Sequence, residues 1–253
     1  MDTVIAIDNL TFAYQNGTPA LHRLSLKVGR GETVVFIGAN GAGKTTLFLY
    51  LLGLLGRLPK EATVLGQPLT SMKAVEAMRG QVGLVFQNPE DQLFCTTVFD
   101  DVAFGPINQG LGAEEVKSRV AEALAAVGLS GFERRVPHHL SGGEQRRVAL
   151  ATIYAMRPEI MFLDEPTSNL DPRAKREAVE LLRAFPGTKL VATHDFELAL
   201  EVADRVVLLH QGEVRANGRP LSILTDETLL KANGLEMPLV IRYFLSWQAR
   251  QAG

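Results

Sequence analysis

A glycine-rich segment near the start of the chain has the residue types and the spacing that bind the phosphates of a nucleotide. Residues 38–45 read Gly-Ala-Asn-Gly-Ala-Gly-Lys-Thr and match the phosphate-loop pattern G-x-x-x-x-G-K-[ST]. Glycines let backbone N–H groups turn inward around phosphate oxygens, and a following helix adds positive potential from its N-terminus. Lys44 would reach the β- and γ-phosphates, and the Thr45 hydroxyl would bind Mg²⁺. The alternative is an ordinary glycine-rich turn between a strand and a helix.

Two adjacent carboxylates follow a later apolar run. Asp164 and Glu165 come directly after residues 160–163, Ile-Met-Phe-Leu. Ligands of α/β sheets bind beyond the carboxyl ends of the strands, so we expect these acids to face the same crevice as the phosphate loop. Asp164 would hold Mg²⁺, and Glu165 would polarise the attacking water as a general base. Alone, the pair is more typical of a strand end with a solvated turn, and the presence of the phosphate loop reverses that preference in favour of the nucleotide interpretation.

A third segment, residues 139–145, reads His-Leu-Ser-Gly-Gly-Glu-Gln. Ser141 and Glu144 have the spacing of a capping box at the start of a helix. Ser141 and the amides of Gly142 and Gly143 would then offer a second anion site at a helix N-terminus. The alternative is a helix start that happens to contain glycines.

The elements around these motifs predict an α/β protein. Residues 33–37 form a continuous apolar run that stops at the glycine loop, as a strand covered on both faces does. A helical stretch is expected from Lys44 to about Leu55. Alternating strand and helix later in the chain predict a parallel sheet with helices on its faces. The expected strands are 160–163, 190–192 and 206–209, with helices near 172–184 and 196–203.

The remaining regions have a different character. Before residue 30, apolar and polar residues alternate with period two around a turn at residues 16–19, which predicts half-exposed strands. The middle of the chain is richer in helical spacing. We expect a single domain over residues 1–253, with a helical insertion at about 88–157 and a C-terminal extension at about 226–253.

The composition excludes several classes of protein. With 253 residues, 46% hydrophobic and 21% charged, the chain can pack a core, so disorder is not expected. The chain has 26 Lys and Arg residues against 28 Asp and Glu residues. Because basic residues are not in excess, we do not expect a nucleic-acid partner. The longest apolar stretch, residues 47–55, is too short to span a membrane. A single cysteine, Cys95, and no secretory signal pattern predict a cytosolic chain that reaches a membrane through a partner.

Together these motifs resemble those of the ABC-type ATPases. Leu-Ser-Gly-Gly-Glu-Gln, about a hundred residues after the phosphate loop, resembles the signature motif of that family. The resemblance covers residues 3 to about 225. It implies an α/β fold of the P-loop NTPase (ABC ATPase) type, with a parallel-sheet core, an N-terminal antiparallel β-subdomain and an inserted helical subdomain.

The resemblance implies roles for residues that spacing alone does not single out. Gln87 matches the Q-loop glutamine, His194 the switch histidine and Tyr14 the aromatic residue that stacks on adenine. Asp171, in Ser-Asn-Leu-Asp, matches the D-loop aspartate that signals across a dimer. Alone, Tyr14 is typical of a packed strand residue and His194 of a surface histidine. The expected catalytic residues are Lys44, Gln87, Glu165 and His194, the Mg²⁺ ligands are Thr45, Gln87 and Asp164, and the ATP contacts are Tyr14, Gly38, Asn40, Gly41, Ala42, Gly43, Lys44, Thr45, Thr46, Gln87, Ser141, Gly142, Gly143 and Asp171.

A narrower resemblance concerns residues 85–106. Val-Phe-Gln-Asn-Pro-Glu-Asp-Gln-Leu-Phe, followed by Thr-Val and Asp-Val-Ala-Phe-Gly-Pro, resembles the energy-coupling-factor branch, the ATPases of cobalt, nickel and vitamin importers. The acidic extension after Gln87 is implied to meet the coupling helices of a transmembrane partner. Two departures leave the nucleotide chemistry untouched. Residues 56–67 are short and lack the usual glycine-led strand, and Asp100 stands where the family often has Glu.

We therefore expect an ATPase that uses ATP and Mg²⁺ to power such an importer for cobalt or nickel ions. The alternatives are the ATPase of a vitamin importer, or a soluble ABC ATPase outside transport. The resemblance implies a head-to-tail dimer, with itself or a paralogous ATPase, that sandwiches two ATP molecules. It implies a transmembrane coupling subunit, a separate substrate-binding membrane component and a peripheral position on the cytoplasmic face of the cell membrane. The apolar stretch 239–251, with Phe244 and Trp247, either adds dimer contacts or packs on its own domain.

Overall fold

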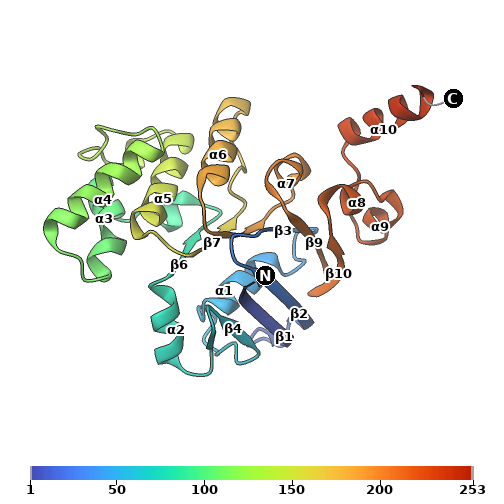
Figure 1. The fold of residues 1–253 in the computed structure, drawn as a ribbon, viewed down its shortest axis with the longest axis horizontal. Coiled ribbons are helices and arrows are strands. Elements are labelled where there is room, and N and C mark those ends of the chain that lie inside the picture. The colour runs from blue at the N-terminus through green and yellow to red at the C-terminus, as the bar shows by residue number, and fades with distance from the viewer. Residues whose placement is uncertain (1, 252–253) are drawn as a thin grey trace.

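The computed structural model describes residues 2–251 and is built around a six-stranded sheet (Figure 1). The strand order is β10-β9-β3-β8-β7-β6, and all neighbours are parallel except β9 and β10, which form a hairpin. Every residue of β3, β7 and β8 is buried, because packed elements cover both faces of the sheet. The strands are β3 (Thr33–Ile37), β6 (Val82–Val85), β7 (Ile160–Asp164), β8 (Thr188–Ala192), β9 (Arg205–His210) and β10 (Glu213–Gly218).

The two faces of this sheet bury separate hydrophobic cores. Along β3, Val35 faces the core shared with α6 (Pro172–Ala184) and α7 (Phe196–Val202). Phe36 faces the opposite core, where its ring meets that of Phe48 on α1 (Lys44–Leu51) edge-on. Strand residues alternate between faces, so a continuous apolar run is what a strand between two cores requires. The predicted parallel sheet with helices on its faces is confirmed.

A second, antiparallel sheet lies under α1 in the order β2-β1-β4-β5 (Figure 1). It is the predicted N-terminal β-subdomain. The segment 56–67 contributes a strand to it although no glycine leads into that strand, since Val64 pairs with Ile5. The strands are β1 (Thr3–Ala13), β2 (Pro19–Gly29), β4 (Ala62–Val64) and β5 (Gln67–Pro68).

The helix after the phosphate loop is shorter than predicted. We expected it to continue to about Leu55, but α1 ends at Leu51 and Gly53 adopts a left-handed φ of 65°. Arg79, at the end of α2 (Met72–Arg79), donates hydrogen bonds to the carbonyls of Leu52 (2.9 Å) and Gly53 (3.0 Å). The extension to Leu55 was therefore wrong, because a side chain from elsewhere in the chain satisfies the carbonyls at the helix end.

Three helices inserted between β6 and β7 form a bundle beside the β6 edge of the sheet (Figure 1). They are α3 (Val98–Asn108), α4 (Ala113–Ala126) and α5 (Gly142–Met156). This is the predicted inserted helical subdomain. Its position places the start of α5 and the loop after β6 on the same side of the sheet as the end of β7.

The C-terminal helices follow β10, and the last of them extends away from the body of the molecule (Figure 1). On that helix Tyr243 and Trp247 are 71% and 58% exposed, whereas Ile241 packs against the core. Most of its described apolar side chains therefore do not pack on their own domain. Within residues 2–251, no helix combines the length and apolar character needed to cross a membrane. The three helices are α8 (Pro220–Leu224), α9 (Glu227–Ala232) and α10 (Leu239–Gln251).

Candidate functional site

A cavity of about 580 Å³ opens where β3 and β7 end, between the phosphate loop and the segments that follow β6, β7 and β8. It brings together twelve of the residues that the sequence singles out. They are Tyr14, Asn40, Gly41, Ala42, Gly43, Lys44, Thr45, Thr46, Gln87, Asp164, Glu165 and His194, joined by Thr18, Pro19 and Ala20. Gly38 lies at the base of the loop, while Ser141, Gly142, Gly143 and Asp171 do not line the cavity.

The phosphate loop is held in a shape that glycine alone allows. Gly43 has a φ of 103°, and a Cβ there would lie 2.7 Å from the carbonyl oxygen of Ala20. At the start of the loop, a Cβ on Gly38 would lie 2.3 Å from the carbonyl oxygen of Leu209. The loop is thus packed against its neighbours on the outside. Its glycines allow backbone N–H groups to turn toward an anion, although the N–H of Ala42 donates to the carbonyl of Ala39 (3.1 Å).

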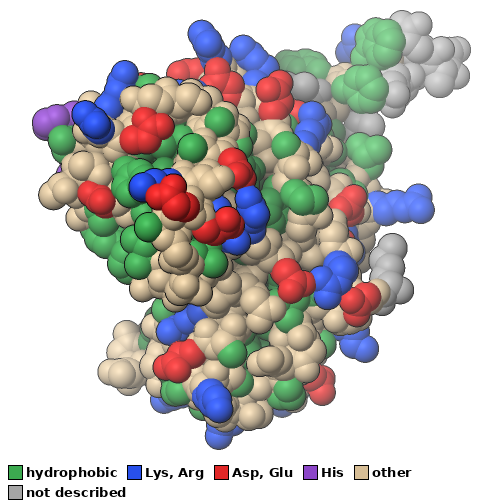
Figure 2. All heavy atoms as spheres, turned by 60° about the vertical axis from the view of Figure 1, so that its left-hand side comes forward, with side chains coloured by type: hydrophobic (Ala, Val, Ile, Leu, Met, Phe, Trp, Pro, Cys, Tyr) green, Lys and Arg blue, Asp and Glu red, His purple; other side chains and the backbone are tan. Residues whose placement is uncertain are grey.

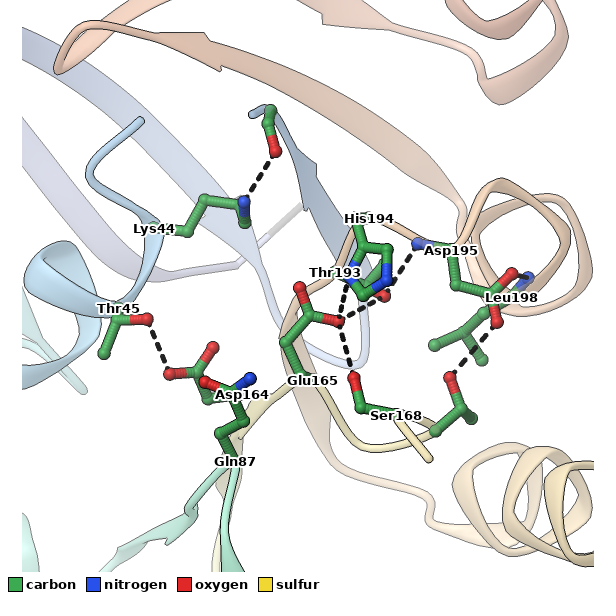
Figure 3. A network of polar contacts seen from close by, with 12 residues as sticks. Lys44, Thr45, Gln87, Asp164, Glu165, Ser168, Thr193, His194, Asp195 and Leu198 are labelled. Carbon is green, nitrogen blue, oxygen red and sulfur yellow. Dashed lines mark hydrogen bonds and ion pairs between the residues drawn. The ribbon is translucent and has the colours of Figure 1, made fainter. Parts of the chain in front are cut away.

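Lys44 lies buried inside the loop and contacts carbonyl groups (Figure 3). Its Nζ donates hydrogen bonds to the carbonyl oxygens of Gly38 (2.6 Å) and Ala39 (3.3 Å). Burial lowers the pKa of Lys44, although the carboxylates of Glu165 and Asp164 oppose that shift. This ammonium could exchange its two carbonyl contacts for the oxygens of a phosphate bound in the loop.

Thr45 and Asp164 form the pair that suits a magnesium ion. The Thr45 hydroxyl donates a 2.7 Å hydrogen bond to Oδ2 of Asp164. Burial raises the pKa of Asp164 and the charge of Glu165 adds to this, against the hydrogen bond from Thr45 and the charge of Lys44. A buried carboxylate short of positive charge, beside a hydroxyl and the Gln87 amide in one cavity, presents the oxygen ligands that Mg²⁺ prefers. These residues fit the ion.

Glu165 is the best-positioned candidate for a general base (Figure 3). It is 6% exposed and has a φ of 49°, a backbone conformation that is rare outside glycine and concentrated at functional sites. Its Oε2 accepts hydrogen bonds from Thr193 Oγ1 (3.1 Å) and Ser168 Oγ (3.2 Å) and lies 2.9 Å from Nδ1 of His194. Among the described residues these contacts all use Oε2, so Oε1 is left to take a proton from water.

Thr193 and Ser168 were not predicted as site residues. Both belong to segments that the sequence analysis selected for another residue. Thr193 precedes His194, and Ser168 lies in the same segment as Asp171. Thr193 is fully buried, and its hydroxyl also accepts the N–H of Asp195 (3.0 Å), which fixes its direction toward Glu165. The sequence offers only a weak signal for Thr193, namely a hydroxyl residue at a strand end close to another motif.

Tyr14 is one of the residues that line the cavity. Its ring is 40% exposed and meets Phe12 edge-on, and its hydroxyl hydrogen-bonds Thr46 Oγ1 (2.8 Å). The residue is therefore anchored at one end and open to the cavity along its ring. This placement is more typical of a ring that stacks on a nucleotide base than of a strand residue that only packs in the core.

Ser141, Gly142 and Gly143 lie at the N-terminus of α5, outside the cavity. The capping box is present: Ser141 Oγ accepts the N–H of Glu144 (3.4 Å), and Glu144 Oε2 accepts the N–H of Ser141 (2.8 Å). A Cβ on Gly142 would meet nothing within 4 Å. Packing within this chain therefore does not explain why position 142 is a glycine.

Asp171 also lies outside the cavity and has a clear structural function. It is the N-cap of α6, where its Oδ1 accepts the N–H groups of Arg173 (2.8 Å) and Ala174 (3.0 Å). These two backbone hydrogen bonds lower the pKa of Asp171. Its contacts within the chain therefore concern the start of α6.

Asp195 stabilises the segment that carries His194, and we expect this contribution to be lost in acid. Burial raises the pKa of Asp195, but hydrogen bonds from Lys175 and the N–H of Leu198 outweigh it, so the folded pKa lies below the ordinary value. A depressed folded pKa stabilises the protein above the unfolded pKa of about 4 and ceases to do so below the folded one. Asp195→Asn should lower the free energy of unfolding by about 1 kcal/mol at pH 7, and its effect should be smaller near pH 3, which lies below the unfolded pKa.

Urea unfolding of both proteins at the two pH values measures this difference. Glu197→Gln is the control, because Glu197 pairs with the same Lys175 (2.8 Å) but its side chain is 62% exposed. An equal effect of Asp195→Asn at pH 7 and pH 3 would contradict the assignment.

Comparisons with known proteins find a matching family model and similar curated proteins. The family model described as ABC transporter matches residues 21–168. The chain is 48% identical to the energy-coupling factor transporter ATP-binding protein EcfA of Methanothermobacter thermautotrophicus, over 93% of this chain and 77% of that protein. It is 46% identical to the EcfA protein of Methanocaldococcus jannaschii, over 94% of this chain and 86% of that protein.

Two solved structures share this architecture over most of the chain. The structure of cbiO1 from Clostridium perfringens, described as part of the ABC transporter complex cbiONQ, has a TM-score of 0.80 at 32% identity and covers 96% of this chain and 99% of its own. A dimeric post-hydrolysis state of the ATP-binding cassette MJ0796 bound to ADP and Pi has a TM-score of 0.75 at 28% identity, with 85% and 98% covered.

Proposed function

The chain belongs to the ABC transporter family, and we propose that it powers the import of cobalt or nickel ions by a transporter of the energy-coupling-factor type. It is the ATP-binding subunit of such a transporter and hydrolyses ATP to drive transport. The observation that carries the proposal is the single cavity in which Lys44, Thr45 and Asp164 meet the hydrogen-bonded carboxylate of Glu165. The preference for a metal over a vitamin rests on two resemblances, the acidic segment after Gln87 and the intact set of nucleotide motifs. The alternative cargo is a vitamin.

In the proposed reaction each side chain does what its contacts allow. Lys44 would exchange its loop carbonyls for the β- and γ-phosphates of ATP, and Thr45 and Asp164, with Gln87, would hold the metal ion. Bound Mg²⁺ supplies positive charge to the phosphate oxygens. Oε1 of Glu165 accepts a proton from the attacking water while Thr193, Ser168 and His194 hold Oε2 in place.

The proposed site is completed by a second chain. Ser141 and the adjacent amides face outward from the start of α5 and do not reach the cavity of their own chain. We propose that they bind the γ-phosphate of the ATP held by a partner, in a homodimer or a dimer with a paralogous ATPase, with Asp171 near the same interface. ATP then favours the closed dimer and hydrolysis releases it, because only the triphosphate bridges both chains.

The proposed contact with the membrane partner is an apolar surface beside the acidic segment Pro89–Asp91. Phe94 is 63% exposed and meets the 50% exposed ring of Phe104 edge-on, and Ile107 is also exposed. Figure 2 shows hydrophobic side chains gathered on the helical side of the molecule among charges of both signs. An exposed apolar group of this kind suits a helix of the transmembrane coupling subunit. This contact would hold the chain peripherally at the cytoplasmic face of the membrane, with cargo bound by a separate membrane component.

The cargo is tested by uptake of labelled Co²⁺ and Ni²⁺ in native cells. A chromosomal Glu165→Gln replacement should reduce uptake of at least one of the two ions to the level of a deletion strain, because transport needs the chemical step. Glu180→Gln, on the exposed surface of α6, is the matched control and should transport normally. Unchanged uptake of both ions in the Glu165→Gln strain would overturn the metal cargo and direct the search to vitamins.

A further inference from the structure

Arg146 is a buried cation that lies between two parts of the site, and neither motif reasoning nor the proposed mechanism gives it a function. It is 5% exposed and occupies the fifth position of α5, the helix that begins after Ser141. Its Nη1 donates a 2.6 Å hydrogen bond to the carbonyl oxygen of Glu165, and Nη2 donates a 2.9 Å hydrogen bond to the carbonyl oxygen of Gln87. A single guanidinium therefore joins α5 to the end of β7 and to the loop after β6.

The contact with Glu165 falls where the backbone needs support. Glu165 has a left-handed φ of 49°, and its N–H already donates to the carbonyl of Ala192 (2.8 Å). Arg146 binds the carbonyl oxygen of the same residue at 2.6 Å, and that oxygen also accepts the N–H of Ser168 (3.2 Å), so both backbone groups of Glu165 are fixed. The direction of the Glu165 side chain is set by this backbone geometry, which strand pairing alone would not impose beyond the end of β7.

The chemistry of the side chain is specific to arginine. A guanidinium is planar and carries N–H groups on separate nitrogens, so it can donate to two carbonyls in different loops at once. A lysine ammonium is a shorter point donor and would keep at most one of these contacts in the same geometry. Burial lowers the pKa of Arg146 and the nearby Glu165 carboxylate opposes that shift. The two hydrogen bonds therefore offset part of the cost of burying the charged guanidinium, and they fix its position.

We propose that Arg146 is a positioning residue that links three parts of the site, namely helix α5, the loop that contains Gln87 and the general base Glu165. A displacement of α5 or of the Gln87 loop moves the guanidinium, and the guanidinium moves the backbone of Glu165. The inference rests on the proposed function, because it assigns to Arg146 the alignment of the residue that activates water. It also gives a physical route by which the membrane partner beside the Q-loop affects the rate of hydrolysis.

The adjacent Arg147 provides a matched control. It has the same charge and lies on the same helix, but its side chain turns to α6, where Nη1 lies 3.2 Å from Oε2 of Glu177. It contacts neither Glu165 nor Gln87 among the hydrogen bonds of the described residues. A substitution there removes an arginine from α5 without altering the link to the site.

The test compares Arg146→Lys and Arg146→Met with Arg147→Lys and Arg147→Met in the purified full chain with Mg²⁺ and ATP. We expect Arg146→Lys to lower kcat by about 30-fold and Arg146→Met by at least as much, because small misplacements of a catalytic group cost about 100-fold. The KM for ATP, and the affinity for a fluorescent ATP analogue, should change by less than about threefold, because the phosphate loop is untouched. The Arg147 variants should keep kcat within about twofold.

Each of the remaining outcomes supports or overturns the positioning function of Arg146. A kcat for Arg146→Lys within twofold of wild type overturns the positioning function, as does a fall in ATP affinity as large as the fall in kcat. If Arg146→Met does not fold, Arg146→Lys decides, with its unfolding temperature measured alongside. If neither variant folds, Arg146 is a core residue and the proposal is overturned. A wild-type chain without ATPase activity would instead refute the proposed function, which keeps the two failures distinguishable.

Discussion

Replacing Glu165 with glutamine is expected to lower kcat for ATP hydrolysis by about a thousandfold while ATP affinity stays within about threefold of wild type. Glutamine keeps the shape of the side chain, and its amide oxygen still accepts the hydrogen bonds that Thr193 and Ser168 donate to Oε2. It cannot take a proton from water, so the chemical step fails and ATP binding persists. The closed, ATP-bound dimer should then accumulate.

Phosphate release measures the first effect, and size-exclusion chromatography with light scattering measures the second. Glu180→Gln, an exposed glutamate on α6, is the control for the loss of a carboxylate and should match wild type in both measurements. Turnover at the wild-type rate in Glu165→Gln would remove Glu165 from the function of general base.

The second large effect is expected from Ser141→Arg. Ser141 caps α5 and faces away from the cavity of its own chain, so an arginine there leaves ATP binding by the single chain unchanged. In the proposed dimer the same position meets the γ-phosphate held by the partner, where a large side chain has no room. ATP-dependent dimerisation should be abolished, and kcat should fall at least about a hundredfold, because phosphate-binding groups of this kind contribute that much to catalysis.

The loss of a helix cap needs its own control, because removing a capping serine costs about 1 kcal/mol wherever it lies. Ser71 caps α2 in the same way, with its side chain accepting the N–H of Ala74 (3.3 Å). Ser71→Arg removes a cap of the same kind away from the proposed interface, and it should keep ATPase activity and dimerisation. Wild-type turnover in Ser141→Arg would refute the shared site.

Local patterns were enough to predict most of the elements that carry the site. The phosphate loop follows β3 and begins α1, and the carboxylate pair follows β7, as the apolar runs and glycine spacing indicate. What failed was the end of α1, because the carbonyls of Leu52 and Gly53 are bound by Arg79 rather than by a helix continuing to Leu55. Gly53, with its left-handed φ of 65°, is a local signal for that end, whereas the contact with Arg79 leaves no trace in the spacing of residues 44–55.

The supporting residues of the site could not be predicted for the same physical reason. Arg146 and Arg147 are adjacent and chemically identical, and no local pattern tells which one is buried against Glu165 and which one faces α6. That choice depends on how α5 packs against the ends of two strands. Thr193 likewise acquires its contact with Glu165 only because β7 and β8 are paired in parallel, with Asp164 beside Ala192.

The central claim is that one chain supplies the catalytic carboxylate and phosphate loop while another supplies the signature serine. A crystal structure of the Glu165→Gln variant with ATP and Mg²⁺ tests this most directly. We predict a head-to-tail dimer in which each ATP contacts Lys44 and Thr45 of one chain and the partner subunit's Ser141. ATP bound within a single chain, with Ser141 facing solvent, would contradict it.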